Sequence, residues 1–127
     1  MKALEECCGV KKTASLSNYY LPYFVKHAGI IEGNQKFGTA NDEENGLAVK
    51  ISFKTEDNQI VKARHSCNSE PVLIAGCERL CEMLEGKTLD YAKKVTADEL
   101  IDFFPEVPVE KRSLLELTVK AMRRGLE

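Results

Sequence analysis

The apolar residues of this chain change their spacing once, close to residue 68, and that change constrains the fold more than any other feature. Between residues 47 and 54 apolar and polar side chains alternate, which predicts a β-strand with one buried face. Residues 59–66 follow a turn-forming segment and predict a second strand, so the two strands are expected to pair antiparallel. From residue 69 to residue 85 the spacing is that of an amphipathic helix, which we expect to pack across the sheet.

Signals at both ends support this helix. Ser69 is a predicted N-cap, and Pro71 lies in the first turn, where a missing N–H costs little. Gly86 is predicted to end the helix because glycine adopts the left-handed conformation that follows a helix. The residues expected to face inward are Leu73, Cys77, Leu80 and Leu84.

The N-terminal part predicts one more helix and one more strand. A helix is expected from Ser17 toward Gly29, with Pro22 tolerated in its first turns. Residues 32–46 are rich in glycine, asparagine and acidic residues, and they predict a loop with a short strand at 36–39.

The C-terminal part predicts helices only. Thr88 and Thr96 are the predicted N-caps of two short helices, and the second of these ends before Pro105. A last helix is expected over residues 109–124. Its inward residues are Leu114, Leu115, Val119 and Met122.

This order of elements predicts an α+β fold, with a small antiparallel sheet of two to three strands and helices packed on one face. A chain of 127 residues that is 43% hydrophobic and 30% charged suffices for one globular core. We therefore expect a single domain over residues 15–125, preceded by an N-terminal extension over residues 1–14.

Charge and hydropathy exclude two classes of partner. The formal net charge is −2, so no overall positive field attracts nucleic acid. No apolar run approaches the roughly 20 residues that span a bilayer, and the first residues do not form a secretory signal. We expect a cytoplasmic protein that binds neither nucleic acid nor membranes. The sequence does not predict an oligomeric state.

The five cysteines predict reduced thiols because an odd number gives no disulfide framework. Cys77 and Cys81 coincide with the inward face of the predicted helix and are interpreted as small buried side chains. Cys67 lies in a polar connection before a helix N-terminus, where backbone N–H groups lower the pKa of a thiol. It is the candidate for a reactive or metal-binding thiolate. Cys7 and Cys8 are interpreted as free thiols, with a redox pair as the alternative.

The other polar residues predict no catalytic arrangement. Val61, Ala63 and His65 share one face of their strand, so His65 is interpreted as a hydrogen-bonded core histidine and not as a metal ligand. The acidic pairs at 43–44 and 56–57 are interpreted as solvated charge. No nucleophile elbow, phosphate-binding loop or dinucleotide-binding turn is present, so we expect no enzyme. The basic residues of the last helix suit its dipole, with an acidic partner surface as the alternative. They are Lys111, Arg112, Lys120, Arg123 and Arg124.

Four segments, in this order, resemble the IscU/NifU-type iron–sulfur cluster assembly scaffolds. They are the run at 57–64, the helix from 71–75 through 82–85, the Gly-Lys-Thr-Leu turn at 86–89 and the closing helix with Ser-Leu-Leu at 113–115. The resemblance covers residues 16–124. It implies a scaffold to which a cysteine desulfurase delivers sulfur, and on which three cysteine thiolates hold the growing cluster.

The positions that the family uses for those thiolates carry other residues here. With no gap between Arg64 and Gly86, the three positions are occupied by Asn45, Glu70 and Arg112. A shift of three residues would instead make Cys67 the remaining central cysteine. Either alignment leaves fewer than three thiolates. The alignment without a gap predicts that Asn45, Glu70 and Arg112 come close in space.

These observations leave two hypotheses. The first is a divergent scaffold-like protein with a partner-binding or regulatory role in cluster assembly, which holds no stable cluster. The partner that the resemblance implies is a cysteine desulfurase or another cluster-assembly protein. The alternative is a metal-binding protein that holds iron or zinc through Cys67, with Glu70 or another nearby ligand.

Overall fold

The structure is a computed structural model that describes residues 13–29, 31 and 36–127. Cys7, Cys8 and part of the predicted loop lie outside the described residues. The described elements are α2 (Ser17–Tyr20), β1 (Lys36–Asp42), β2 (Leu47–Glu56), β3 (Gln59–Cys67), α3 (Pro71–Leu84), α4 (Leu89–Lys93), α5 (Ala97–Phe103), the 3-10 helix η1 (Val109–Lys111) and α6 (Arg112–Leu126).

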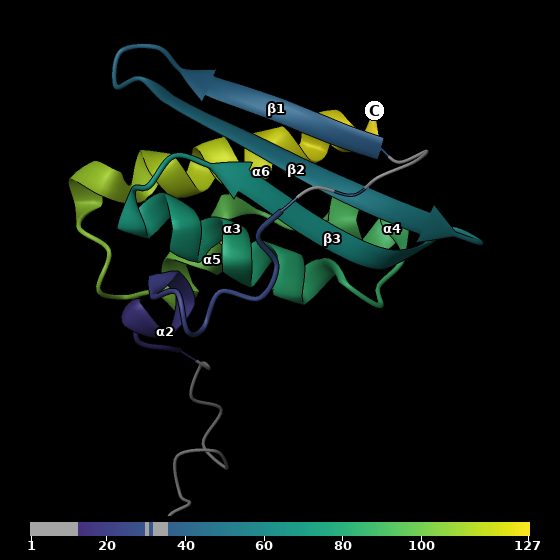
Figure 1. Ribbon diagram of the computed structural model, residues 1–127, viewed down its shortest axis with the longest axis horizontal. Helices are drawn as coiled ribbons and strands as arrows, with labels where there is room; N and C mark the ends of the chain where they lie inside the picture. Colours follow the sequence, from purple (N-terminus) through teal and green to yellow (C-terminus); the bar gives the residue numbers. More distant parts are fainter. Residues whose placement is uncertain (1–12, 30, 32–35) are drawn as a thin grey trace, which may run out of the picture.

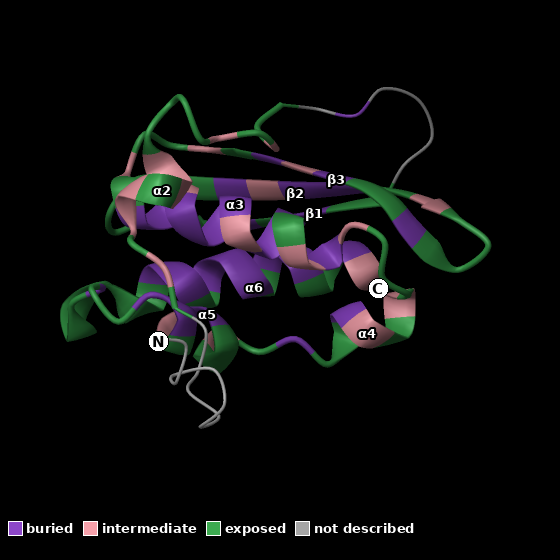
Figure 2. Cartoon of the chain, turned by 90° about the horizontal axis from the view of Figure 1, so that it is seen from below, coloured by how far each residue is buried: buried purple, intermediate pink, exposed green. Residues whose placement is uncertain are grey.

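The three strands form one antiparallel sheet in the order β1–β2–β3. Helices α3 and α6 form a layer against one face of this sheet, with α6 along β1 and β2 and α3 along β3 (Figure 1). Helices α4 and α5 lie on the far side of that layer, and buried residues fill the space between the layers (Figure 2). The predicted α+β class and the predicted hairpin are confirmed.

The layer of helices approaches the sheet most closely where two glycines meet. A Cβ atom on Gly38 of β1 would overlap the backbone of Ala121 and Gly125 in α6. A Cβ atom on Gly125 would in turn lie 2.8 Å from a ring carbon of Phe53 in β2. Glycine at both positions therefore sets the distance between α6 and the sheet.

The first predicted helix is wrong in its length. Helix α2 ends at Tyr20 and does not continue toward Gly29. Leu21 has an extended backbone, with ψ of 141°, because the ring of Pro22 disfavours the helical conformation in the residue before it. The chain then leaves Tyr23 93% exposed and Phe24 46% exposed.

The predicted face of the second strand is wrong at one residue. Lys54 pairs with Lys62 and Thr55 pairs with Ile60, so Val61 is an extra residue in β3. This β-bulge moves Val61 out to 43% exposure and places Ile60 in the core, while Ala63 and His65 stay buried as predicted.

Helix α3 begins and ends close to the predicted residues, but its N-cap is Glu70 and not Ser69. The Glu70 carboxylate accepts hydrogen bonds from the backbone N–H groups of Val72 and Leu73, at 2.6 and 3.1 Å. At the other end Gly86 has a positive φ of 84°, as predicted. The N–H of Gly86 donates to Ile60 O at 2.7 Å, which attaches the end of the helix to β3.

The C-terminal helices follow the prediction with one difference. Thr88 caps α4, and Thr96 forms a capping box with Glu99 at the start of α5. The last helix opens with a 3-10 turn and continues as α6 to Leu126. Each of its four predicted inward residues is buried.

Candidate metal centre

The end of β3 and the second turn of α3 bring three possible metal ligands together. His65 and Cys67 are two residues apart in a strand, so both side chains point to the same face of the sheet. Helix α3 lies along that face and contributes Cys77. The ligand atoms of His65, Cys67 and Cys77 all lie within 4.8 Å of one another.

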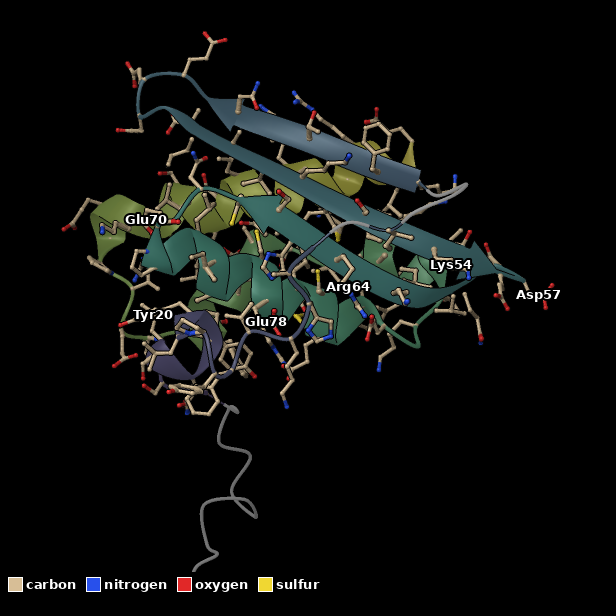
Figure 3. The ribbon with its side chains drawn as sticks, in the orientation of Figure 1. Tyr20, Lys54, Asp57, Arg64, Glu70 and Glu78 are labelled. Carbon is tan, nitrogen blue, oxygen red and sulfur yellow. The ribbon has the colours of Figure 1, made fainter. Side chains whose placement is uncertain are left out.

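His65 is held in place by a buried carboxylate from α3. Its Nε2 lies 3.0 Å from Glu78 Oε1, and both side chains are about 95% removed from solvent. The ring of His65 also makes a hydrogen bond to the Cys67 side chain. Figure 3 shows Glu78 projecting from the middle of α3.

Glu78 also fastens the chain that runs from α2 toward β1. Its carboxylate accepts the backbone N–H groups of Lys26 and His27, each at 3.0 Å, and lies 2.7 Å from His27 Nδ1. The N–H of His65 donates to His27 O, and the N–H of Gly29 donates to His65 O, both at 2.9 Å. Residues 26–29 therefore form a strap that is bonded to both β3 and α3.

A second carboxylate continues this network at the end of α3. Glu85 Oε1 lies 3.3 Å from His27 Nε2, and Glu85 Oε2 accepts hydrogen bonds from Arg64 at 2.7 Å and from the N–H of Ala63 at 2.9 Å. Arg64 also donates to its neighbour's carbonyl, Ala63 O, at 2.7 Å. The network orders the side chains around His65 without using any thiol.

The surroundings shift the pKa values of Cys67 and Cys77 in opposite directions. Donation from Cys77 lowers the pKa of Cys67 well below the usual thiol range; burial opposes this shift, and the hydrogen bond and charge of His65 add to it. The pKa of Cys77 is raised by its hydrogen bond to Cys67 and by its complete burial. The cause differs from the predicted helix N-terminus, because Glu70 already occupies the first N–H groups of α3.

The pKa values of the polar neighbours are shifted as well. Burial lowers the pKa of His65, but hydrogen bonds to Cys67 and Glu78 outweigh it and raise the pKa above 6.5. Burial raises the pKa of Glu78, yet hydrogen bonds from His65, from His27 and from two backbone N–H groups lower it to about 2. The carboxylate is therefore ionised at neutral pH.

Two clefts meet at Cys67, which is half-buried. The larger has a volume of about 470 Å³ and lies between α2, the strap and β3; Tyr20, Pro22 and Ile74 are among its lining residues. The smaller, of about 270 Å³, lies on the side of β1 and β2 and includes Asn68. Cys77 lines neither cleft, so of the two thiols Cys67 is the one that a molecule from solvent reaches.

Asn45, Glu70 and Arg112 are predicted to come close in space, but within the described part of the chain they make no hydrogen bond or ion pair with one another. The cation that pairs with Glu70 is Lys111, with Nζ 2.9 Å from Oε2, and not Arg112. Lys111 is the last residue of η1 and directly precedes Arg112, the first residue of α6. Asn45 is bound within its own turn, where it donates to Asp42 at 2.7 Å. Glu70 is thus occupied by a helix cap and an ion pair.

The interpretation of the cysteines is confirmed in part. Cys77 and Cys81 are fully buried, as predicted from the helix face. The sequence interpretation missed that Cys77 turns toward Cys67 and that His65 belongs to the same cluster. The signal was available in part, since His65 and Cys67 have the spacing that puts two strand residues on one face. Which strand residue the Cys77 side chain meets depends on how α3 packs against the sheet.

The three residues fit a single transition-metal ion. Two thiolates and one imidazole are a ligand set that zinc and iron accept, with a fourth position open to an outside ligand. From the usual bond lengths, ligand atoms around a tetrahedral zinc lie roughly 3.5 Å apart. Atoms within 4.8 Å of one another reach that spacing through small side-chain rotations.

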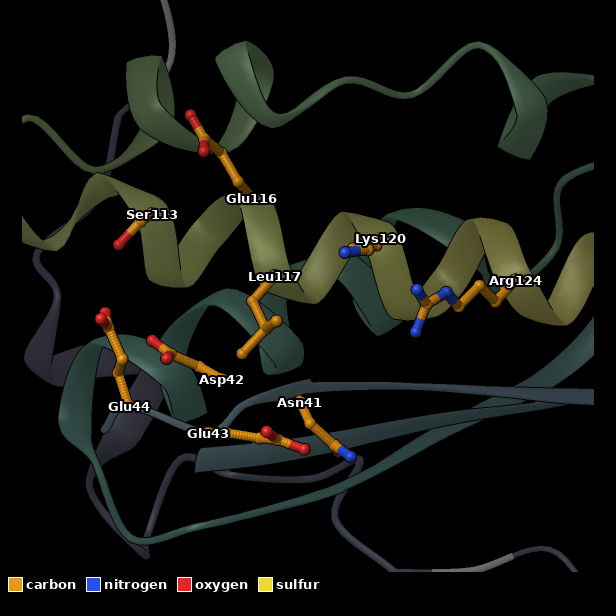
Figure 4. Close-up of a pocket in the computed structure, with 9 residues that line it drawn as sticks. All are labelled: Asn41, Asp42, Glu43, Glu44, Ser113, Glu116, Leu117, Lys120 and Arg124. Carbon is orange, nitrogen blue, oxygen red and sulfur yellow. The ribbon is translucent and has the colours of Figure 1, made fainter. Parts of the chain in front are cut away.

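A larger cleft elsewhere has a different character. It has a volume of about 570 Å³ and lies between the β1–β2 turn and α6 (Figure 4). Asp42, Glu43 and Glu44 line one wall, and Lys120 and Arg124 lie along the other. Both glutamates, the lysine and the arginine are exposed, in agreement with solvated charge, and no thiol or imidazole lines the cleft.

Within residues 13–29, 31 and 36–127, every helix is too short or too polar to cross a bilayer.

Sequence comparison supports the resemblance. A family model for the "NifU-like N terminal domain" matches residues 14–127. Two proteins of Archaeoglobus fulgidus, the iron-sulfur cluster assembly scaffold proteins IscU 1 and IscU 2, are each 28% identical over 101 residues. The match covers 80% of this chain and 66% of each relative, so the chain spans slightly less than two-thirds of their length.

Solved structures share the fold at low identity. A protein known only as hypothetical has a TM-score of 0.71 at 14% identity, and the match covers 87% of this chain and 93% of that chain. A NifU-like N-terminal protein from Brucella abortus has a TM-score of 0.66 at 13% identity, with coverage of 87% and 94%. Both are similar to this chain in the arrangement of its sheet and helices.

Proposed function

Because the chain belongs to the family of NifU-like N-terminal domains, which are scaffolds for iron–sulfur cluster assembly and not enzymes, we propose that it binds one iron or zinc ion through His65, Cys67 and Cys77. The ion would be held at a place displaced from the family's three-cysteine site. The proposal includes a cytoplasmic location and a partner among the cluster-assembly proteins, such as a cysteine desulfurase.

The observation that carries this proposal is the meeting of one imidazole and two thiols within 4.8 Å. The carboxylate of Glu78 supports it, because histidines that bind metals usually place their second nitrogen against a carboxylate or a carbonyl. Cleft access at Cys67 gives an ion and its fourth ligand a way in.

The same geometry argues against a stable cluster. Cluster iron is typically held by four thiolates, and at most two are present at this centre. Glu70, which the alignment without a gap puts at the family's central position, is committed to the first turn of α3 and to Lys111. We therefore propose that the chain handles a single ion during cluster assembly and does not build a cluster on itself.

Anaerobic purification followed by elemental analysis tests the proposal. We expect about one iron or zinc per chain, lost in Cys67→Ser and in His65→Ala. Cobalt(II) added to the metal-free protein reports the ligands, because each thiolate contributes charge-transfer absorption. That absorption should weaken in Cys77→Ser and stay unchanged in Cys81→Ser, which changes an equally buried thiol one turn further along the same helix. Metal-free protein that gives no cobalt absorption would rule the proposal out.

A second function, partner binding without metal, is favoured by one surface feature. The exposed apolar side chains are Leu21, Tyr23 and Phe24. They lie next to residues that line the 470 Å³ cleft at Cys67. Such clusters often mark protein contact sites. A chain that binds a cluster-assembly partner through this surface, while holding no ion, would retain that binding in Cys67→Ser.

A further inference from the structure

The two thiols of the candidate metal centre lie close together but differ in their access to solvent. Cys67 lines both clefts, whereas Cys77 is fully buried behind it. Their sulfur atoms lie within 4.8 Å of each other. A reagent from solvent therefore meets Cys67 before Cys77, and among the described cysteines Cys77 is the one grouped with Cys67 within 4.8 Å.

We infer that Cys67 and Cys77 form a redox-active dithiol that a small disulfide, such as oxidised glutathione, converts to an intrachain disulfide. The Cys67 thiolate attacks one sulfur of the small disulfide, which gives a mixed disulfide on Cys67 and releases one small thiolate that takes up the proton lost by Cys67. The Cys77 sulfur then attacks Sγ of Cys67 and expels the second small thiolate, which takes up the Cys77 proton. Two protein thiols are oxidised, and one small disulfide is reduced to two small thiols.

The local structure allows the bond to form. A disulfide needs its sulfurs about 2 Å apart, and the half-buried Cys67 side chain, which borders both clefts, is the one with room to rotate toward Cys77. Cys67 is the last residue of β3, and the clefts on both sides leave room for a mixed disulfide. Cys77 sits in the interior of α3 and is backed by Thr118 Oγ1 at 3.8 Å, so it stays in place to receive the bond.

This dithiol chemistry shares its two sulfurs with the proposed metal site but does not require that metal binds. A disulfide removes both sulfur ligands at once, so the metal-bound and oxidised states exclude each other. Oxidation would then release the ion, and a bound ion would protect the thiols.

Peptide mapping tests the inference on the full-length, metal-free protein. Reduced protein is treated with oxidised glutathione, free thiols are alkylated, and trypsin is added. Cleavage after Arg64 and Arg79 leaves Cys67 and Cys77 in one peptide, 65–79, while Cys81 falls in peptide 80–87. We expect peptide 65–79 to lose two hydrogens and to escape alkylation. A link between peptides 65–79 and 80–87, or unchanged alkylation of 65–79, would overturn the inference.

Matched variants separate the two steps. In Cys77→Ser we expect the glutathione adduct to accumulate on Cys67, since the second thiol is missing. In Cys67→Ser we expect Cys77 to stay unmodified, and in Cys81→Ser we expect the wild-type result. Absence of an adduct in Cys77→Ser, or modification of Cys77 in Cys67→Ser, would contradict the proposed order. If Cys77→Ser does not fold, Cys77→Ala replaces it, and the wild-type peptide map stands by itself.

The same oxidation is repeated on protein that has first been loaded with zinc. This comparison separates the redox dithiol from the proposed metal site. Slower oxidation with zinc supports both. Oxidation at the same rate with and without zinc supports the dithiol and counts against the metal site. Zinc binding without any disulfide supports the metal site and counts against the dithiol.

Discussion

Glu78 Oε1 lies 3.0 Å from His65 Nε2 in the buried layer between β3 and α3, so a carboxylate from the helix fixes the ring of the strand histidine. The same carboxylate takes three more hydrogen bonds from Lys26 and His27. It orients a candidate metal ligand and secures the strap at residues 26–29 together.

We expect Glu78→Gln to weaken zinc binding by about 10- to 100-fold, because loss of a carboxylate behind a ligating histidine typically has that effect. Competition with a chromophoric chelator measures the affinity. Glu82→Gln, one turn along α3 and 45% exposed at its side chain, serves as the control and should bind as the wild type does. Equal affinity in Glu78→Gln would mean that His65 is not a ligand.

We expect no iron–sulfur cluster to persist after reconstitution with iron, sulfide and reductant. At most two thiolates are available at the centre, and Cys81 is buried away from it. Visible absorption after desalting measures the outcome. Cys67→Ser should change the free energy of unfolding little, since this residue is at the end of its strand and half-exposed. A cluster that survives desalting and is absent from Cys67→Ser would show that ligands are shared between chains.

Gly38→Ala should lower the free energy of unfolding by about 1–3 kcal/mol or more, because the added methyl group meets the backbone of α6, which cannot rotate away. Gly46→Ala is the comparison. Its φ is +66° and the space around it is open, so only the backbone conformation costs energy, about 1 kcal/mol. Urea unfolding of both variants measures the difference. A milder effect at Gly38 than at Gly46 would mean that α6 can move away from β1.

Glu85 should contribute stability that depends on pH. Burial raises its pKa, but the hydrogen bonds from Ala63 and Arg64 lower it below 4.5. A lowered pKa in the folded state means that the contribution is present above pH 4.5 and is lost as the pH falls through the folded value. We expect Glu85→Gln to lower the free energy of unfolding by about 1 kcal/mol at neutral pH, since this carboxylate is partly exposed. The difference from wild type should vanish in acid.

Urea unfolding across a pH series checks the last prediction. Glu116→Gln, an exposed acid on α6, is its control and should leave the pH profile unchanged. A Glu85→Gln effect that persists at acid pH would assign the stabilisation to packing and not to charge.

Local spacing predicted most of the fold, and the errors have local causes. The hairpin, α3 and α6 follow from apolar periodicity and from caps such as Thr88 and Thr96. Helix α2 stops early because of Pro22, and Val61 turns outward because of a bulge that alternation alone does not reveal. That the N-terminal segment preceding domain residues 15–125 acts as an extension stays a prediction.

The candidate site was less predictable than the fold. Cys67 could be singled out from its place at a strand–helix junction. Its partner Cys77 could not, because the helix periodicity states only that Cys77 faces inward and not which strand residue it meets. The role of Glu78 could not be predicted either. Its burial is explained only by its contacts with His27 and His65, which come from other elements of the fold.

The attachments along β3 also determine where this sheet can grow. On the side away from β2, the backbone groups of Ile60, Ala63 and His65 are all occupied, by the chain after α3, by Glu85 and Arg64, and by the strap. An additional strand, from another copy or from a misfolded neighbour, cannot pair with these three residues, because their backbone groups are already bonded. It would have to approach along β1, where Arg124 already bonds to the Thr39 carbonyl at 3.0 Å. The bonds that order the thiol site thus also block the β3 edge of the sheet against a further strand.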